Sequence, residues 1–140
     1  KITIHSGIVF EATDLNGLSD PYVKFYNLHT DKLLFTTKVQ KKTLEPVWEE
    51  DFEVSLNCNI DVLFQVYDKD LITDDYIGEY RFDLASDLDI EPVRSRAPFK
   101  TVEKMEVELY HKDRRLVKKG KLTFTIRGMG PGSPEAPFTQ

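Results

Sequence analysis

The sequence predicts an all-β domain, either a sandwich or a barrel, on three observations. The dominant hydrophobic period is two rather than 3.6, as in strands with one buried face. The apolar runs are rich in β-branched and aromatic residues. Turn-forming pairs such as Asn16-Gly17, Asp20-Pro21 and Lys119-Gly120 separate these runs. About eight short runs of this kind are typical of a β-sandwich or β-barrel.

Each run predicts one strand, and the order along the chain is regular. In the last run, Leu122, Phe124 and Ile126 alternate onto one face. We expect the run 61–67 to be a strand buried on both faces. The expected strands are residues 2–10, 22–26, 33–39, 48–56, 61–67, 80–84, 105–110 and 121–127. The aromatic side chains expected in the core are Trp48, Phe52, Phe64 and Tyr67.

Length and composition bound the domain organisation. The chain has 140 residues, enough for one domain with its own core. We expect that domain to span residues 1–127, because residues 128–140 are rich in Gly and Pro and are typical of a linker or disordered tail. The first residues already form a strand-like run, which suggests a part of a larger multidomain protein.

Charge and cysteine content exclude several classes. The net charge of -5 disfavours nucleic acid as a partner, because binding to phosphates needs a basic footprint. The single cysteine, Cys58, allows no internal disulfide and favours a reducing compartment such as the cytoplasm. No apolar run approaches the ~20 residues that a spanning helix needs.

Two acidic segments, residues 14–20 and 68–75, lie where loops are expected, each between two strands. Calcium takes 6–8 oxygen ligands, which two loops at one end of a sandwich can supply together. Asp68 and Asp70 are two positions apart, so an extended backbone directs both carboxylates to one side. Such clustering of like charges is costly without a cation. The alternative is that these aspartates are ordinary solvated turn residues.

Other metal sites fit poorly. An EF-hand loop that began at Asp68 would need Gly and Glu at its sixth and twelfth positions, which are Thr73 and Glu79 here. Zinc ligand spacing is absent, because the chain has one cysteine and its three histidines are scattered: His5, His29 and His111.

Several motifs follow one another along the chain: GLSDPYVK at residues 17–24, KKTLEPVWEEDF at 41–52, VYDKD at 66–70, DYIGE at 75–79 and KGKLTFTI at 119–126. Together they resemble the C2 domain family. The first resembles its first-loop signature, the second its central motif, with Glu45 where Asn is commoner, the third and fourth its third-loop region, and the last a final C2 strand. The resemblance covers roughly the first 127 residues.

This resemblance implies an eight-stranded antiparallel Greek-key β-sandwich, in the second of the family's two circularly permuted topologies. It also implies two or three Ca2+ ions. The implied ligands are the carboxylates of Asp14, Asp20, Asp68, Asp70 and Asp75. The backbone carbonyl of Lys69 and the Asp74 side chain are candidate further ligands. On one alignment Asp14 is the first ligand, six residues before Asp20; on another, the first loop is shortened and lacks that ligand. The N-terminus is expected at the end opposite the calcium loops.

The resemblance also implies membrane contacts. Leu18, Leu71 and Ile72 lie near the loop tips and are candidates for insertion into the bilayer interface. A basic patch is the candidate phosphoinositide site, and its alternative is a solvated sheet face: Tyr22, Lys24, Lys38, Lys41 and Lys42. The basic run 112–119 is expected to be an exposed turn that adds nonspecific attraction to the membrane.

The leading hypothesis is a calcium-dependent module that binds anionic phospholipid membranes and recruits or tethers a larger protein there. We expect it at the cytosolic face as a peripheral protein, in a membrane-tethering, synaptotagmin-like or tricalbin-like context. The alternative is a calcium-independent C2 domain for protein interaction or constitutive phosphoinositide binding. An enzyme is not indicated, since the sequence lacks a nucleophile elbow and a P-loop.

Overall fold

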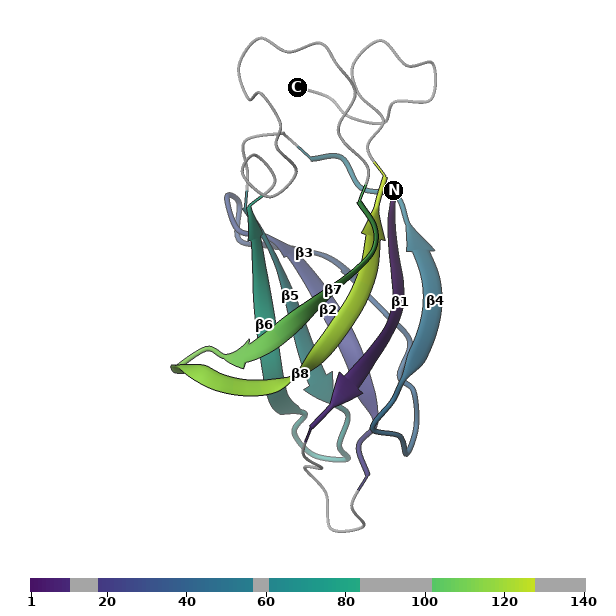
Figure 1. Ribbon diagram of the computed structural model, residues 1–140, viewed down its shortest axis with the longest axis vertical. Coiled ribbons are helices and arrows are strands. Elements are labelled where there is room, and N and C mark those ends of the chain that lie inside the picture. The colour runs from purple at the N-terminus through teal and green to yellow at the C-terminus, as the bar shows by residue number, and fades with distance from the viewer. Residues whose placement is uncertain (11–17, 57–60, 84–101, 128–140) are drawn as a thin grey trace, which may run out of the picture.

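The computed structural model describes residues 1–10, 18–56, 61–83 and 102–127, and these form an antiparallel β structure (Figure 1). Among these described residues, none belongs to a helix long and apolar enough to cross a bilayer. The strands are β1 (Ile2–Val9), β2 (Pro21–Asn27), β3 (Lys32–Thr36), β4 (Val47–Phe52), β5 (Asp61–Asp68), β6 (Asp75–Asp83), β7 (Val102–His111) and β8 (Arg114–Ile126).

The strands form two layers. They follow the order β3-β2-β5-β6-β7-β8-β1-β4, but β6 and β7 share only the pair Glu79↔Tyr110. The sheet folds over at that junction, so β3-β2-β5-β6 faces β7-β8-β1-β4. Aromatic contacts bridge the layers: the rings of Phe64 and Phe124 are 4.5 Å apart. The predicted eight-stranded antiparallel sandwich is therefore confirmed.

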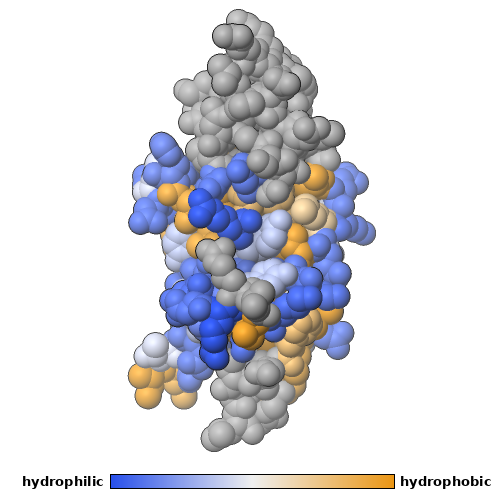
Figure 2. Space-filling view, turned by 60° about the vertical axis from the view of Figure 1, so that its left-hand side comes forward, coloured by the Kyte–Doolittle hydropathy of each residue, from blue (hydrophilic) through white to orange (hydrophobic). Residues whose placement is uncertain are grey.

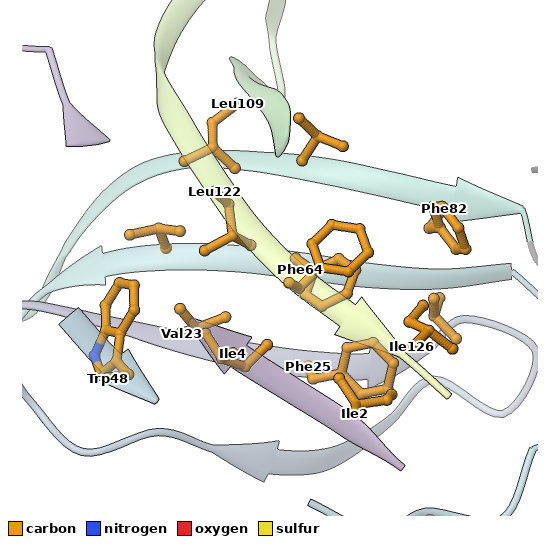
Figure 3. Packing of buried hydrophobic residues seen from close by; sticks show 14 of the residues in the cluster. Ile2, Ile4, Val23, Phe25, Trp48, Phe64, Phe82, Leu109, Leu122 and Ile126 are labelled. Carbon is orange, nitrogen blue, oxygen red and sulfur yellow. The ribbon is translucent and has the colours of Figure 1, made fainter. Parts of the chain in front are cut away.

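The core lies between these layers (Figure 3). Leu122, Phe124 and Ile126 of β8 are all buried, as their alternation predicts. On β5, Phe64 and its inward neighbours are buried, but the other face is only half-buried. The expectation that residues 61–67 are buried on both faces is wrong, because only one face of this layer is covered by the other layer. Tyr67 accordingly lies outside the core, whereas Trp48 and Phe64 are inside it.

Two strand boundaries differ from expectation by five residues or more. β6 begins at Asp75, five residues before the predicted start. The run 112–119 is not an exposed turn, because β8 begins at Arg114 and only two residues separate it from β7. Cross-strand ion pairs stabilise this basic segment as a strand: Lys118 Nζ lies 3.0 Å from a carboxylate oxygen of Glu108. Figure 2 shows a mostly hydrophilic surface on this side of the molecule.

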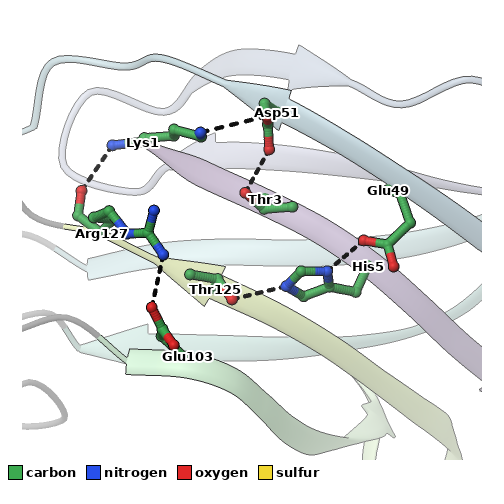
Figure 4. A network of polar contacts seen from close by, with 8 residues as sticks. All are labelled: Lys1, Thr3, His5, Glu49, Asp51, Glu103, Thr125 and Arg127. Atoms are coloured by element: carbon green, nitrogen blue, oxygen red, sulfur yellow. Dashed lines mark hydrogen bonds and ion pairs between the residues drawn. The ribbon is translucent and has the colours of Figure 1, made fainter.

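The outer face of β4, β1, β8 and β7 carries a polar network (Figure 4). The amino terminus of Lys1 donates to the Arg127 carbonyl at 2.9 Å, and the Thr3 hydroxyl donates to Asp51 at 2.6 Å. His5 contacts Glu49 on β4 through one ring nitrogen and Thr125 on β8 through the other. These contacts tie the first strand to both of its neighbours.

The N-terminus lies at one end of the sandwich, and β1 runs from there to the opposite end, where the β5–β6 connection lies (Figure 1). The expected separation of the N-terminus from the acidic loops is therefore seen. The assignment to the second permuted topology stays a prediction.

Candidate functional site

The two acidic segments meet at one end of the sandwich. Pro21, which opens β2, pairs with Asp68, which closes β5. The Asp20 amide donates to Asp68 Oδ1 at 2.7 Å, and the Lys69 amide donates to the Asp20 carbonyl at 2.9 Å. Asp68 is almost fully buried, with 3% of its surface exposed. The register between β2 and β5 thus places an acidic residue from each connection side by side. Asp14 lies outside the described residues.

The β3–β4 connection packs against the same acidic pair. The Lys42 amide donates to Asp20 Oδ1 at 2.6 Å, and the Thr43 amide donates to the Ser19 carbonyl at 2.7 Å. Lys42 adopts a positive φ of 53°, in the left-handed region. Lys41 and Lys42 have exposed side chains. Basic side chains therefore stand at the same end as the aspartates.

Asp70 and Asp74 are held within the β5–β6 connection. The Asp70 amide donates to Asp74 Oδ1 at 3.0 Å, and the Leu71 amide donates to Asp70 Oδ1 at 2.6 Å. Asp74 also accepts from the Tyr22 hydroxyl and forms an ion pair with Lys69 Nζ at 3.7 Å. The Tyr22 hydroxyl, followed by the Asp70 amide, lowers the pKa of Asp74 below its ordinary value.

The donor chemistry at this end suits calcium. The described donors are carboxylate, carbonyl and hydroxyl oxygens, which a hard cation prefers. The Ser19 hydroxyl is buried beside Asp20 and has no hydrogen-bond partner within the described part of the chain. Among the described residues, however, no three His, Cys, Asp or Glu side chains converge on one point. The carboxylates instead accept from backbone amides, so a bound cation would have to replace those donors.

Two large apolar side chains project beyond the acidic residues. Leu71 is 100% exposed and Ile72 is 95% exposed, far more than any other large hydrophobic residue of the described chain. Leu18 of the neighbouring segment is half-buried and makes contacts of its own. The exposed tip therefore belongs to the β5–β6 connection, whereas Leu18 is only partly available.

A row of rings crosses the outward face of β2, β5, β6 and β7. Tyr22 stacks on Tyr67 at 5.9 Å between centroids, and Tyr67 meets Tyr76 edge-on at 5.7 Å. Tyr76 continues the row to the His111 ring at 5.4 Å. Lys24 Nζ lies 4.5 Å from the Tyr67 centroid, within range of a cation–π contact. Burial, and then the contact with Asp74, raise the pKa of the Tyr22 hydroxyl.

The row ends beside a cavity of about 420 Å³. Lys112 Nζ lies 4.9 Å from the Tyr76 centroid there, in a second cation–π contact. The Glu79 carboxylate accepts from Gln65 Nε2 at 3.0 Å and from the Tyr76 hydroxyl at 2.9 Å. The lining residues are Leu28, Leu63, Glu79, Tyr80, Arg81, Tyr110, His111 and Lys112.

Comparison with known proteins identifies the family. The model of the C2 domain matches residues 1–99. The chain belongs to the C2 domain family. It is 43% identical over 79 residues to C2 domain-containing protein At1g53590 of Arabidopsis thaliana, covering 51% of this chain and 10% of that protein. It is 38% identical over 96 residues to human Synaptotagmin-3, covering 65% of this chain and 16% of that protein.

Solved structures agree on the fold. A C2 domain of plant Extended Synaptotagmin 1 aligns with a TM-score of 0.70 at 23% identity, covering 99% of this chain and 94% of that one. A two-domain C2 fragment of Extended-Synaptotagmin 2, in a structure described as calcium bound, aligns with a TM-score of 0.62 at 22% identity, covering 92% of this chain and 45% of that one. At these identities the likeness shows the fold alone.

In this C2 domain the predicted basic patch divides into two places. Tyr22 and Lys24 lie on the outward face of β2, and Lys38 follows β3 with an exposed side chain. Lys41 and Lys42 instead lie at the end where the aspartates meet. Sequence reasoning missed Tyr76 and Lys112 on the ring row. The signal for Tyr76 was its pairing with Tyr67, which can be read only when the register of β5 and β6 is known.

Proposed function

We propose that this C2 domain is a calcium-dependent phospholipid-binding module that recruits or tethers a larger protein to anionic membranes. One arrangement carries the proposal: Asp20 and Asp68 touch through the amide of Asp20, and the fully exposed Leu71 and Ile72 stand on the same end. The matched relatives are far longer than this chain, which covers 10% and 16% of two of them. We place the module in such a longer protein, at the cytosolic face of a membrane.

The charge of the loops would make membrane binding depend on calcium. Without metal, the carboxylates make this end negative and repel a membrane with anionic lipids. We assign Asp20, Asp68, Asp70 and Asp75, with the Lys69 carbonyl, as the ligands, together with Asp14 from the first loop. Two or three Ca2+ ions would bring a positive charge of about +4 to +6, enough to invert that field and to coordinate lipid oxygens.

The apolar tip adds the second attraction. Leu71 and Ile72 are already exposed to water, so transfer into the bilayer interface removes their apolar surface from water without unpacking the core. Lys41 and Lys42 stand beside Asp20 and can approach anionic headgroups at the same time. Each such lysine contributes about 1 kcal/mol of attraction near an anionic surface.

Co-sedimentation with phosphatidylserine-containing vesicles tests the proposal, in ~1 mM free calcium, a high level for a sensor site, and in excess chelator. The chain should pellet only with calcium, and the double variant Asp68→Asn/Asp70→Asn should stay in the supernatant. Asp31→Asn is the matched control, because Asp31 lies in the β2–β3 turn and its φ of 59° suits Asn. Pelleting of the wild-type chain in chelator would contradict the calcium requirement.

A second candidate function is favoured by the internal hydrogen bonds of the loops. Because the carboxylates already accept from amides, this C2 domain is also suited to bind phosphoinositides constitutively through Lys24 and Lys38, without calcium. Under this alternative, vesicles with phosphatidylinositol bisphosphate bind in chelator and bind Asp68→Asn/Asp70→Asn equally well. Lys24→Ala/Lys38→Ala would weaken that binding roughly 30-fold.

A further inference from the structure

We propose that the free edge of β7, together with the cavity where β6 and β7 part, binds an extended peptide segment of a partner protein. The segment adds to β7 as a further strand and inserts an apolar side chain, with an acidic side chain beside it, into the cavity. This site shares no residue with the acidic loops and needs neither calcium nor a membrane. The inference therefore goes beyond the proposed function and stands independently of it.

The edge of β7 that faces β6 is almost unpaired. On its other side, residues 105–109 pair one for one with residues 124–120 of β8. Among the described strands, the ladder between β6 and β7 contains only the pair Glu79↔Tyr110. Beyond this pair the two strands run apart, toward the N-terminal end of the sandwich (Figure 1). An edge of five residues has the length of an ordinary strand and is a template for another chain.

This stretch of β7 is also regular. Register shifts lie before Met105 and after Leu109, and the residues between them pair without interruption. Glu106 and Glu108 project from the stretch, but each forms an ion pair with a lysine of β8, at 3.6 and 3.0 Å respectively. The other outer strand of this layer, β4, is interrupted by Glu49, whose φ of 46° is left-handed. Of these two edges, β7 is therefore better suited to pair with an extended segment.

A cavity of about 420 Å³ adjoins the end of this edge. Its lining comes from both strands of the single β6–β7 pair, including Arg81 of β6 and Tyr110 of β7. Leu28 and Leu63 add an apolar wall. In strand addition, main-chain hydrogen bonds supply affinity and pockets for alternate side chains supply specificity. A segment that follows β7 past Leu109 therefore meets a cavity that can take one of its apolar side chains.

The charges around the cavity favour an acidic neighbour to that side chain. Lys112 Nζ lies over the Tyr76 ring and forms no ion pair with any described residue. Arg81 is paired with Asp61, yet 59% of its side chain is exposed. The Glu79 carboxylate, the acidic member of the lining, already accepts two hydrogen bonds from neighbouring side chains. Complementary charge therefore selects a segment with an acidic residue close to its apolar one.

Selection from a phage-displayed library of random peptides, on the whole chain in excess chelator, tests the site. We expect the enriched peptides to carry an apolar and an acidic residue two positions apart, on one face of a strand. Fluorescence anisotropy then measures the Kd of the most enriched peptide. Lys112→Glu should weaken binding about 10-fold, and a peptide with Lys in place of its acidic residue should restore it. Lys32→Glu is the matched control, because Lys32 is exposed at the start of β3, and it should change nothing.

Hydrogen exchange tests the backbone pairing. Peptide binding should slow exchange at those amides of residues 105–109 that point away from β8, and N-methylation of alternate peptide amides should weaken binding about 10-fold. Protection at β3 or β4 instead, equal losses in the two lysine variants, or no enriched peptide would overturn the inference. Sedimentation showing that a second copy of the chain occupies this edge would overturn it as well. Because calcium is absent throughout, each of these failures leaves the proposed function untouched.

Discussion

Removal of the apolar loop tip should weaken membrane binding without weakening the fold. Leu71 and Ile72 are 100% and 95% exposed, so Leu71→Ala/Ile72→Ala removes no packed core atoms. Burial of such a side chain stabilises by about 1.5–3 kcal/mol. Two of them contribute at least ~3 kcal/mol if both enter the interface, which is roughly a 100-fold change in the partition coefficient.

The assay is vesicle co-sedimentation over a range of lipid concentrations at fixed free calcium, with the thermal midpoint measured in parallel. Leu33→Ala is the matched control, because Leu33 is 46% exposed but lies near the start of β3, beside the β2–β3 turn at the other end of the sandwich. We expect the double variant to lose about 100-fold in partitioning at an unchanged thermal midpoint, and the control to lose nothing. Equal losses in both variants, or none in either, would refute the insertion of the tip.

Three further predictions concern the loops, the face and the core. Lys24→Ala/Lys38→Ala should lower binding to vesicles with phosphatidylinositol bisphosphate by about 2 kcal/mol, or roughly 30-fold, while leaving phosphatidylserine binding in calcium nearly unchanged. The folded-state pKa of Asp74 is lowered. The ionised carboxylate therefore contributes its full stabilisation above the ordinary pKa of 3.8, and this stabilisation is lost as the pH falls through the lowered pKa. Asp74→Asn should accordingly lower the urea midpoint of unfolding near neutral pH but not in strong acid. Phe64→Ala should reduce the free energy of unfolding by about 3–5 kcal/mol, because its ring is fully buried.

Each of these has a control and a contrary outcome. Lys32→Ala, at the far end of β3, should not change phosphoinositide binding; an equal loss there would indicate a nonspecific charge effect. Asp113→Asn in the β7–β8 turn should not reproduce the pH dependence, and a constant midpoint difference for Asp74→Asn across the pH range would contradict the linkage. A loss below ~1 kcal/mol for Phe64→Ala would contradict the packing of Phe64 against Phe124.

Much of the fold follows from the two-residue period, because burial of one strand face demands it. Leu122, Phe124 and Ile126 were predictable for that reason. The length of β8 was not, since its basic residues look like a turn until Glu108 of β7 is known to form an ion pair with Lys118. The register of the β7–β8 hairpin decides this case.

The candidate site likewise has features that the sequence predicts and features that depend on the strand register. Two acidic segments after two strands predict that Asp20 and Asp68 meet, and the β2–β5 register brings them together. The contact of Tyr22 with Asp74 was not predictable, because it depends on which face of β2 lies beside the β5–β6 loop. Tyr67 was placed in the core from its hydrophobicity, whereas the register puts it on the outward face with Tyr22.

A calcium titration by isothermal calorimetry, on the wild-type chain and on Asp68→Asn, tests most directly whether a divalent cation completes the acidic end of this domain. We predict saturable heat from two or three ions in the wild type and its loss in the variant, which should still unfold cooperatively without calcium. No saturable heat at millimolar calcium in the folded wild-type chain would contradict the proposed calcium dependence.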